Sequence, residues 1–422
     1  MNLDRVRPIA DAVLYEGYVL YPYRASAIKN RCRWTFGVVM PGAYARTDPS
    51  ERAYTQAECV VEGAADPTFL VALRFLHVQA RTVQRWTGDR FVPTESLDVD
   101  GIPLTAWQEA VEREVIVAVP ELPHEHTFRV GAARRIEDVR DRHGQLIGRI
   151  VRRRRELRGA VAVASTPVPG PWRASSLRVR VDNHTSLRSI GDRSDAVLSA
   201  FVAAHTVISV AGGAFLSMTD PPEWAADAVA GCVNVGTWPV LAGEPGDRDL
   251  MLCAPIILSD HPRIAPESAG DMFDATEIDE ILTLRTLTLS DDEKREARMT
   301  DARAAALIDR TESLAPGQMR RLHGTIRRAA RSPEPVGSDV VLVVAGEELT
   351  PGRRVRLRPG VRRADAQDMF LAGRTAVVEA VLRDVDDRPY LAVTLADDPG
   401  ADIHRSHGRF RYFAPDEVEP LP

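Results

Sequence analysis

The stretch FLVALRFLHVQARTVQR, from Phe69 to Arg85, begins with a wholly apolar run and becomes polar only towards its end. The polar side chains Arg74, His77 and Arg81 all follow that apolar start. A strand that enters a hydrophobic core and then emerges from it has this pattern. We therefore predict a long strand here, at the centre of a β-rich fold.

Shorter segments on both sides also have strand character. Tyr15–Tyr23 and Arg33–Met40 are rich in aromatic and β-branched residues, and Glu114–Val119 precedes a proline. Leu177–Val181 alternates between apolar and polar residues, as a half-buried strand does. Many short strands separated by glycine and proline predict an antiparallel β-sandwich, so the fold class is mainly β (α+β).

The pattern becomes helical in the second half of the chain. Asp274–Glu277 and Ser290–Glu293 both match the capping box that begins many helices. Apolar residues recur at helical spacing behind the first box, and the second predicts a helix to about Arg310. We expect residues 269–330 to form a helical extension packed on the sandwich.

A proline-rich stretch, ARSPEPVG at 330–337, is typical of a linker. Five strand signals follow within a short length, which favours a small SH3-like barrel at the C-terminus. Barrels of that kind usually bind partners. The predicted division is a sandwich-like domain, a helical segment, a linker and a barrel, at residues 1–268, 269–330, 331–338 and 339–422.

Composition restricts the class of protein. The 422 residues (46.5 kDa) are 44% hydrophobic and 27% charged, which is typical of a globular protein. No apolar run approaches the ~20 residues that a membrane-spanning helix needs. The N-terminus lacks the pattern of a signal peptide, so we expect a cytoplasmic protein.

Few reactive side chains have a diagnostic context. The four cysteines contain no CxxC pair, which leaves a zinc-finger or iron–sulfur framework unsupported, and we expect reduced, buried thiols. Neither lysine, Lys29 or Lys294, lies in a phosphate-binding loop or another catalytic motif. The sequence therefore predicts no catalytic residue.

Arginines gather between Arg129 and Arg158, where eleven of them face four acidic residues. A turn at Asp141–Gly144 predicts that this region is a pair of arginine-bearing strands. Neighbouring residues of a strand point to opposite faces, so these arginines cannot form one stripe. A solvated sheet edge, a docking surface for an acidic partner and a nucleic-acid site are the alternatives, and the pI near 6.0 disfavours the last. The candidate partner-binding residues are Arg149, Arg152, Arg153, Arg154, Arg155 and Arg158.

Histidines offer a second candidate site. His124 and His126 would project from one face of a strand as half of a metal site. His261 follows Asp260 in a stretch rich in carboxylates, which could hold a divalent metal or perform acid–base chemistry. Helix capping and turn formation explain part of that acidic stretch equally well. We therefore expect no cofactor, with a divalent metal as the alternative.

Three stretches together resemble a known group of proteins. They are AVLYEGYVLYPYRASAIKNRCRWTFGVV, the segment from Asn234 to Leu289 that begins NVGTWPVLAGEPGDRDL, and GRFRYFAPDEVEPL from Gly408 to Leu421. They are similar to an uncharacterised family encoded beside [NiFe] uptake hydrogenase genes in actinobacteria-like genomes. The resemblance implies an accessory role in hydrogenase assembly or maturation, and it supplies no site residue.

The chain lacks the paired CxxC motifs by which a hydrogenase large subunit holds its nickel–iron centre. We therefore expect a non-enzymatic protein-binding factor, whose partner is a hydrogenase subunit or maturation factor. The alternative is a metal-dependent enzyme or metallochaperone that uses His124, His126, His261 and nearby carboxylates.

Overall fold

The chain forms two compact units, Met1–Thr325 and Ile326–Pro422, in the computed structural model. The structure describes residues 3–31, 33–170, 173–264, 270, 272–273, 279–314, 342–344, 347–358, 371, 373–383, 389–396 and 410–421. None of the helices in these ranges is long and apolar enough to cross a membrane.

The first unit is mainly β, as the sequence predicts. Its strands are β1 Tyr54–Trp86, β2 Phe91–Thr94, β3 Ser96–Val99, β4 Ile102–Thr105, β5 Trp107–Val119, β6 His124–Val130, β7 Ala133–Arg140, β8 Leu146–Arg154, β9 Leu157–Pro167, β10 Ala174–Asn183, β11 Phe201–Phe215, β12 Trp238–Leu241 and β13 Leu250–Ala254. Its helices are η1 Leu3–Arg5, α1 Arg7–Tyr15, α2 Ile28–Arg31, α3 Gly42–Ala45, α4 Arg193–Val197, η2 Glu223–Ala225, α5 Ala226–Ala230, α6 Asp279–Leu287, α7 Asp291–Thr300 and α8 Ala302–Glu312.

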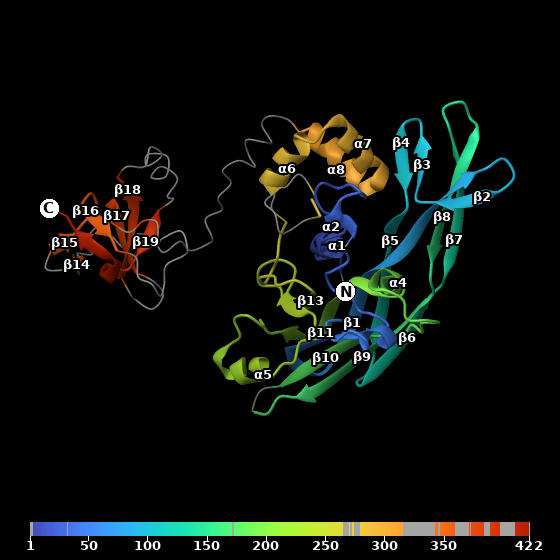
Figure 1. Cartoon of the computed structure of the whole chain (residues 1–422). Helices are drawn as coiled ribbons and strands as arrows, with labels where there is room; N and C mark the ends of the chain where they lie inside the picture. The colour runs from blue at the N-terminus through green and yellow to red at the C-terminus, as the bar shows by residue number, and fades with distance from the viewer. Residues whose placement is uncertain are drawn as a thin grey trace. The chain divides into compact units, whose positions relative to one another are not determined.

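Strand β1 organises one large, curled antiparallel sheet (Figure 1). Its first part pairs with β10, and its middle lies between β11 and β5. Its last part pairs with β2 and β8. The predicted strand Phe69–Arg85 is thus confirmed, and it extends much further towards the N-terminus.

The sheet curls because the consecutive strands β8 and β9 lie near opposite ends of β1. Strand β8 pairs with the last part of β1, whereas β9 pairs with β10, the neighbour of its first part. The interior of the curl is filled by apolar side chains of β1, β5, β9, β10 and β11. Phe201 is one of these side chains, and its ring centroid lies 4.7 Å from that of Phe75 and 5.6 Å from that of Phe128.

Helices cover part of the outer face of the sheet. A second core joins α1, the segment after it and the helices α6, α7 and α8, which lie side by side in Figure 1. The Tyr18 hydroxyl donates to Asp301 at 2.8 Å, which ties the N-terminal segment to α8. The predicted strand at Tyr15–Tyr23 is therefore wrong, because these aromatic residues pack between helices.

The helical extension is present in the described part of 269–330. Ser290 and Glu293 form the predicted capping box at the start of α7. The expected single helix is divided at Asp301, whose side chain accepts from the Arg303 amide and so begins α8. The predicted capping box at Asp274–Glu277 lies outside the described residues.

The second unit contains an antiparallel sheet around its own apolar core. Strands β14 Leu342–Val344 and β15 Glu347–Leu349 form a hairpin. A five-stranded sheet has the order β19-β18-β17-β16-β20, from β16 Arg354–Leu357, β17 Thr375–Arg383, β18 Pro389–Leu395, β19 Arg411–Phe413 and β20 Val418–Pro420. The short helix η4 Pro415–Glu417 precedes β20. The predicted linker at 331–338 lies outside the described residues.

Candidate partner-binding surface

Strands β7 and β8 form the arginine-bearing hairpin that the sequence predicts, with its turn at Asp141–Gly144. Strand β8 lies between β1 and β7, and β7 pairs with no other described strand. The outer side of β7 is therefore a free sheet edge within the described structure. A free edge exposes backbone donors and acceptors and can receive another chain.

Two of the six candidate arginines contact side chains of neighbouring strands. Arg149 donates to Gln84 at 2.6 Å, and its guanidinium lies 4.0 Å from the centre of the Phe91 ring. Arg152 donates to Glu109 at 2.8 Å and to Glu137 at 2.7 Å. These contacts occupy both side chains within the fold.

Three more of the candidate arginines are either in ion pairs or partly buried. Arg155 forms an ion pair with Asp195 of α4, and Arg158 forms one with Glu156 at 2.7 Å. Arg154 is partly buried, and its Nε is enclosed without a hydrogen-bond partner. The ion pairs of Arg155 and Arg158 lie near the surface, where such pairs contribute little to stability.

Arg153 differs from the other five because it is exposed and unpaired. It lies directly opposite Arg134 in the register of β7 and β8, and Arg152 lies opposite Arg135. No ion pair or hydrogen bond among the described residues involves the side chain of Arg134, Arg135 or Arg153. Like charges placed directly opposite each other destabilise a sheet, so the pair Arg134 and Arg153 costs stability while it lacks a partner. Arg135 lies on the other face of the hairpin, because neighbouring residues of a strand point to opposite faces. We call Arg134, Arg135 and Arg153 the free arginines.

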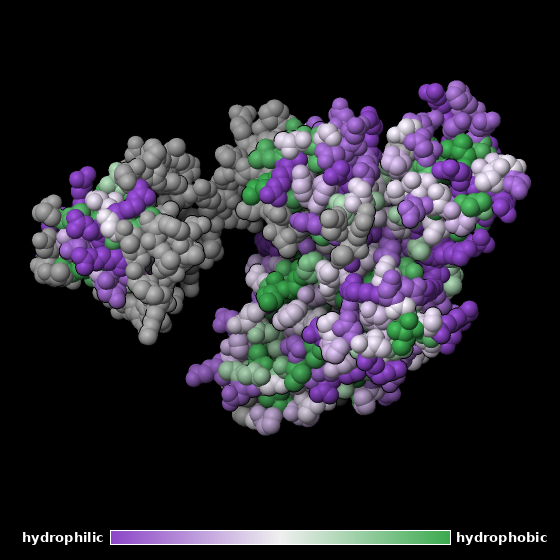
Figure 2. Space-filling view, in the orientation of Figure 1, coloured by the Kyte–Doolittle hydropathy of each residue, from purple (hydrophilic) through white to green (hydrophobic). Residues whose placement is uncertain are grey.

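An apolar residue lies beside this charge. Ile136 of β7 is 44% exposed, between the free arginines and Glu137. Figure 2 shows hydrophilic side chains over much of the hairpin end of the sheet, with apolar ones between them. Mixed basic and apolar surface is suited to an acidic protein segment with apolar side chains of its own.

The three candidate histidines are not gathered into a metal centre within the described residues. His124 and His126 lie on β6 opposite Val163 and Val161. His261 lies in the loop after β13, where its amide donates to the Leu241 carbonyl at 2.7 Å. The described part of the chain contains no group of three or more His, Cys, Asp or Glu side chains suited to a metal ion.

Asp260, beside His261, has a structural role. Its carboxylate accepts from the Leu241 amide at 2.8 Å and from the Ser217 hydroxyl at 2.5 Å. It therefore joins the loop after β11 to strand β12. The further acids of this stretch, Glu267, Asp271, Asp274 and Glu277, lie outside the described residues.

The described cysteines are free thiols, and two of the three are buried as expected, whereas Cys232 is half-buried. Cys59 and Cys253 are buried in the curled sheet. Burial raises the pKa of Cys253 to about 12 and that of Cys59 well above its usual value. Both remain protonated at neutral pH and are poor nucleophiles.

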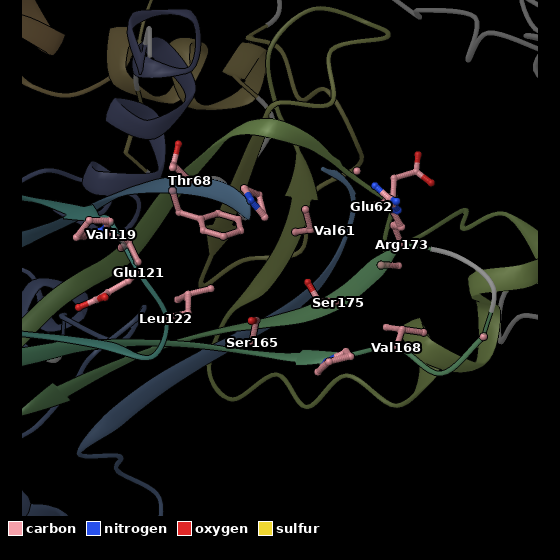
Figure 3. A pocket seen from close by; sticks show the side chains of 17 residues that line it. Val61, Glu62, Thr68, Val119, Glu121, Leu122, Ser165, Val168, Arg173 and Ser175 are labelled. Atoms are coloured by element: carbon pink, nitrogen blue, oxygen red, sulfur yellow. The ribbon is translucent and has the colours of Figure 1, made fainter. Parts of the chain in front are cut away.

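A cavity of about 980 Å³ lies at one end of the curl (Figure 3). It opens where β1 has left β10, at Glu62, and has not yet met β5, at Phe69. Figure 3 shows Leu122 beside Ser165 and Val61 beside Ser175 in its lining.

This cavity combines apolar walls with a polar rim, as small-ligand sites often do. Two acidic residues line it, Glu62 and Glu121, and Glu62 is paired with Arg248 at 2.5 Å. Neither Ser165 nor Ser175 has a histidine or carboxylate partner among the described residues, so the described lining holds no activated nucleophile. The sequence did not indicate this cavity, because its walls come from separate strands that only the curl brings together.

A scan against protein-family models found no matching model, and a search of curated proteins found no match.

Proposed function

We propose that this chain is a non-enzymatic binding protein that docks an acidic segment of another protein on the β7 edge. The observation that carries the proposal is the group of free arginines, Arg134, Arg135 and Arg153. They are exposed on an edge hairpin, and no carboxylate of the described structure neutralises them. An acidic partner would remove the repulsion that the opposed arginines now impose.

The family resemblance directs this proposal towards a class of partner. A [NiFe] hydrogenase subunit or maturation factor is the proposed owner of the acidic segment, and assembly or maturation is the proposed role. The five-stranded sheet of the second unit is the proposed SH3-like barrel, which would supply a second binding module. A non-catalytic cytoplasmic accessory protein would need no more than these surfaces.

Tagged protein captured from its native cell, with mass spectrometry of what co-purifies, tests the proposal. The structure changes the choice of variant: Arg155 is occupied by Asp195, so its reversal would also disturb α4. The double change Arg134→Glu and Arg153→Glu reverses two free arginines instead. We expect a hydrogenase-related protein to co-purify with the wild type, and we expect its recovery to decrease strongly with the variant. Equal recovery by both would contradict docking at this edge.

The metal-dependent alternative makes a different prediction. Elemental analysis of the full chain, purified without chelator, would find a stoichiometric divalent metal if His124, His126 and His261 acted together. Loss of that metal on His261→Ala would then favour a metallochaperone or enzyme. We expect the metal content to be well below stoichiometric, because the described residues contain no group of three or more ligating side chains around these histidines.

A further inference from the structure

A second cavity, of about 480 Å³, lies between the helical layer and the sheet. Arg33 and Arg81 line it together with Trp107, and small side chains such as Ala80 and Ala106 complete the wall. The two arginines are only 3% and 5% exposed. A volume of this size is suited to a small organic molecule.

Arg33 is buried and has no carboxylate partner among the described residues. One of its amino groups, Nη1, donates to the Tyr18 carbonyl at 2.6 Å, and Nη2 has no hydrogen-bond partner. Its guanidinium lies between two indoles, 3.6 Å from the centre of Trp107 and 4.2 Å from that of Trp34. Stacking on aromatic rings attracts a cation, but it does not replace the hydrogen bonds that water would give.

Arg81 and Trp107 add unused donors to the same wall. The Arg81 amino groups donate to Glu109, to the Thr300 carbonyl and to the Thr105 carbonyl, while Nε is unpaired. The indole Nε1 of Trp107 is unpaired as well. Three buried residues therefore line one cavity, and each has a donor that meets no acceptor within the described part of the chain.

The surrounding carboxylates do not supply those acceptors. Glu109 is shared between Arg81 and Arg152, and Asp301 accepts from Tyr18 and from the amide of Arg303. Burial lowers the pKa of Arg33 to about 9, so the guanidinium is still charged at neutral pH. A buried charge of this kind usually has a counter-charge.

We propose that this cavity binds a small organic anion, whose carboxylate or phosphate lies between Arg33 and Arg81 and whose apolar body packs on Trp107. Guanidinium groups pair well with both kinds of oxyanion. The unpaired nitrogens are closed to solvent in this conformation, so the anion reaches them through the side-chain adjustments that are common on binding. This site is independent of the docking edge.

Calorimetric titration of the full chain at constant ionic strength tests the proposal, with inorganic phosphate, phenyl phosphate and benzoate as probes. We expect saturable binding of phenyl phosphate or benzoate, together with a change in tryptophan fluorescence because Trp107 contacts the ligand. Comparison of these two probes identifies the preferred oxyanion. Inorganic phosphate should bind more weakly, since it has no apolar body. The absence of saturable binding with all three probes would overturn the proposal.

Two variants locate the binding. Arg33→Met should weaken affinity by about tenfold or more, because it removes the charged donor. Trp107→Phe keeps a ring beside Arg33 and removes one N–H, so it should weaken binding less than Arg33→Met does. If Arg33→Met does not fold, the affinity of Trp107→Phe tests the site in its place. Arg188→Gln, an exposed site on the loop before α4, is the control and should bind as the wild type does. Unchanged affinity in both cavity variants would place the anion elsewhere and contradict the site.

Discussion

The arginine side chains of the first unit differ in what surrounds the guanidinium group. Arg152 and Arg81 share Glu109, whose side chain is 14% exposed. Arg153, one residue from Arg152, faces solvent and lies opposite another arginine. Strand alternation places Arg152 and Arg153 on opposite faces, and of these two only Arg152 contacts acidic side chains, those of Glu109 and Glu137. The first group stabilises the fold, and the free arginines are available to a partner.

Glu109 should therefore matter more than a surface acid. Glu109→Gln leaves two arginines without their shared carboxylate, and we expect the free energy of unfolding to fall by about 3 kcal/mol. Glu137→Gln is the matched control: Glu137 also contacts Arg152 but is 49% exposed, so the loss should stay below about 1 kcal/mol. Urea denaturation of both variants measures the difference, and equal losses would contradict the importance of the buried pair.

Buried histidines should make the fold sensitive to acid. Burial, together with the nearby charges of Arg113 and Arg154, lowers the pKa of His77 to about 4. An unfolded chain binds this proton near pH 6.5, so the stabilising contribution of the neutral ring is complete above that pH. It is lost as the pH falls from about 6.5 to about 4.

His77→Leu removes that proton linkage. The free energy of unfolding of the variant should fall less steeply between pH 6.5 and pH 4 than that of the wild type, as chemical denaturation at several pH values would measure. His205, with a pKa also lowered to about 4 by burial, should keep part of the slope. Parallel pH profiles for wild type and variant would show that His77 is not the buried group that titrates.

Strand β1 is the element on which the first unit depends, and it bends where it changes neighbours. At Gly63 its φ angle is +135°, and an added Cβ would come within 2.7 Å of the Cα of Gly213 in β11. The register between β1 and β11 shifts between Gly63 and Thr68. Glycine is required here both for the backbone angle and for the close approach of two strands.

Gly63→Ala should lower the melting temperature by several degrees, because it forces β1 and β11 apart. Gly131→Ala is the control: Gly131 has an ordinary backbone angle, and an added Cβ meets no atom within 4 Å. Differential scanning calorimetry compares the two. A variant at position 63 as stable as the one at position 131 would contradict the close packing of the bend.

Local pattern predicts a strand or helix well when the pattern itself causes burial. The alternation of β10 and the capping box at Ser290–Glu293 are such cases, and both are confirmed. The strand expected at Arg33–Met40 is reduced to an isolated bridge at Val39. Its aromatic residue Trp34 packs in the helical core, so burial and not backbone preference explains its composition.

The sites depend on distant elements and could be predicted only in part. The sequence indicates the basic hairpin, but it does not show which arginines are free, because their acidic partners come from other elements. Glu109 lies on β5, and Asp195 lies on α4. The cavity of Arg33, Arg81 and Trp107 exists only because the N-terminal segment packs on the curled sheet.

At the scale of the whole molecule, we propose that the chain acts by binding through its surfaces and not through a reactive centre. The first unit would offer the free edge of β7, and the second unit would offer its small antiparallel sheet as a further module. Deletion of residues 339–422 should therefore leave recognition of the acidic segment by the β7 edge intact. Complete loss of that recognition in the shortened chain would assign the docking surface to the second unit.

A single substitution separates docking from folding. Arg134→Glu places an acid opposite Arg153, so the variant should be as stable as the wild type or slightly more stable. The change of charge at the edge should nevertheless weaken the binding of an acidic partner. Arg188→Glu makes the same change of net charge on the loop before α4 and is the control.

The most direct measurement is the affinity of the captured partner for wild type, Arg134→Glu and Arg188→Glu, at low and at moderate salt. We expect Arg134→Glu to bind at least about tenfold more weakly than the control, with a smaller dependence on salt. Equal affinity and equal salt dependence for all three proteins would show that the free arginines do not dock the partner.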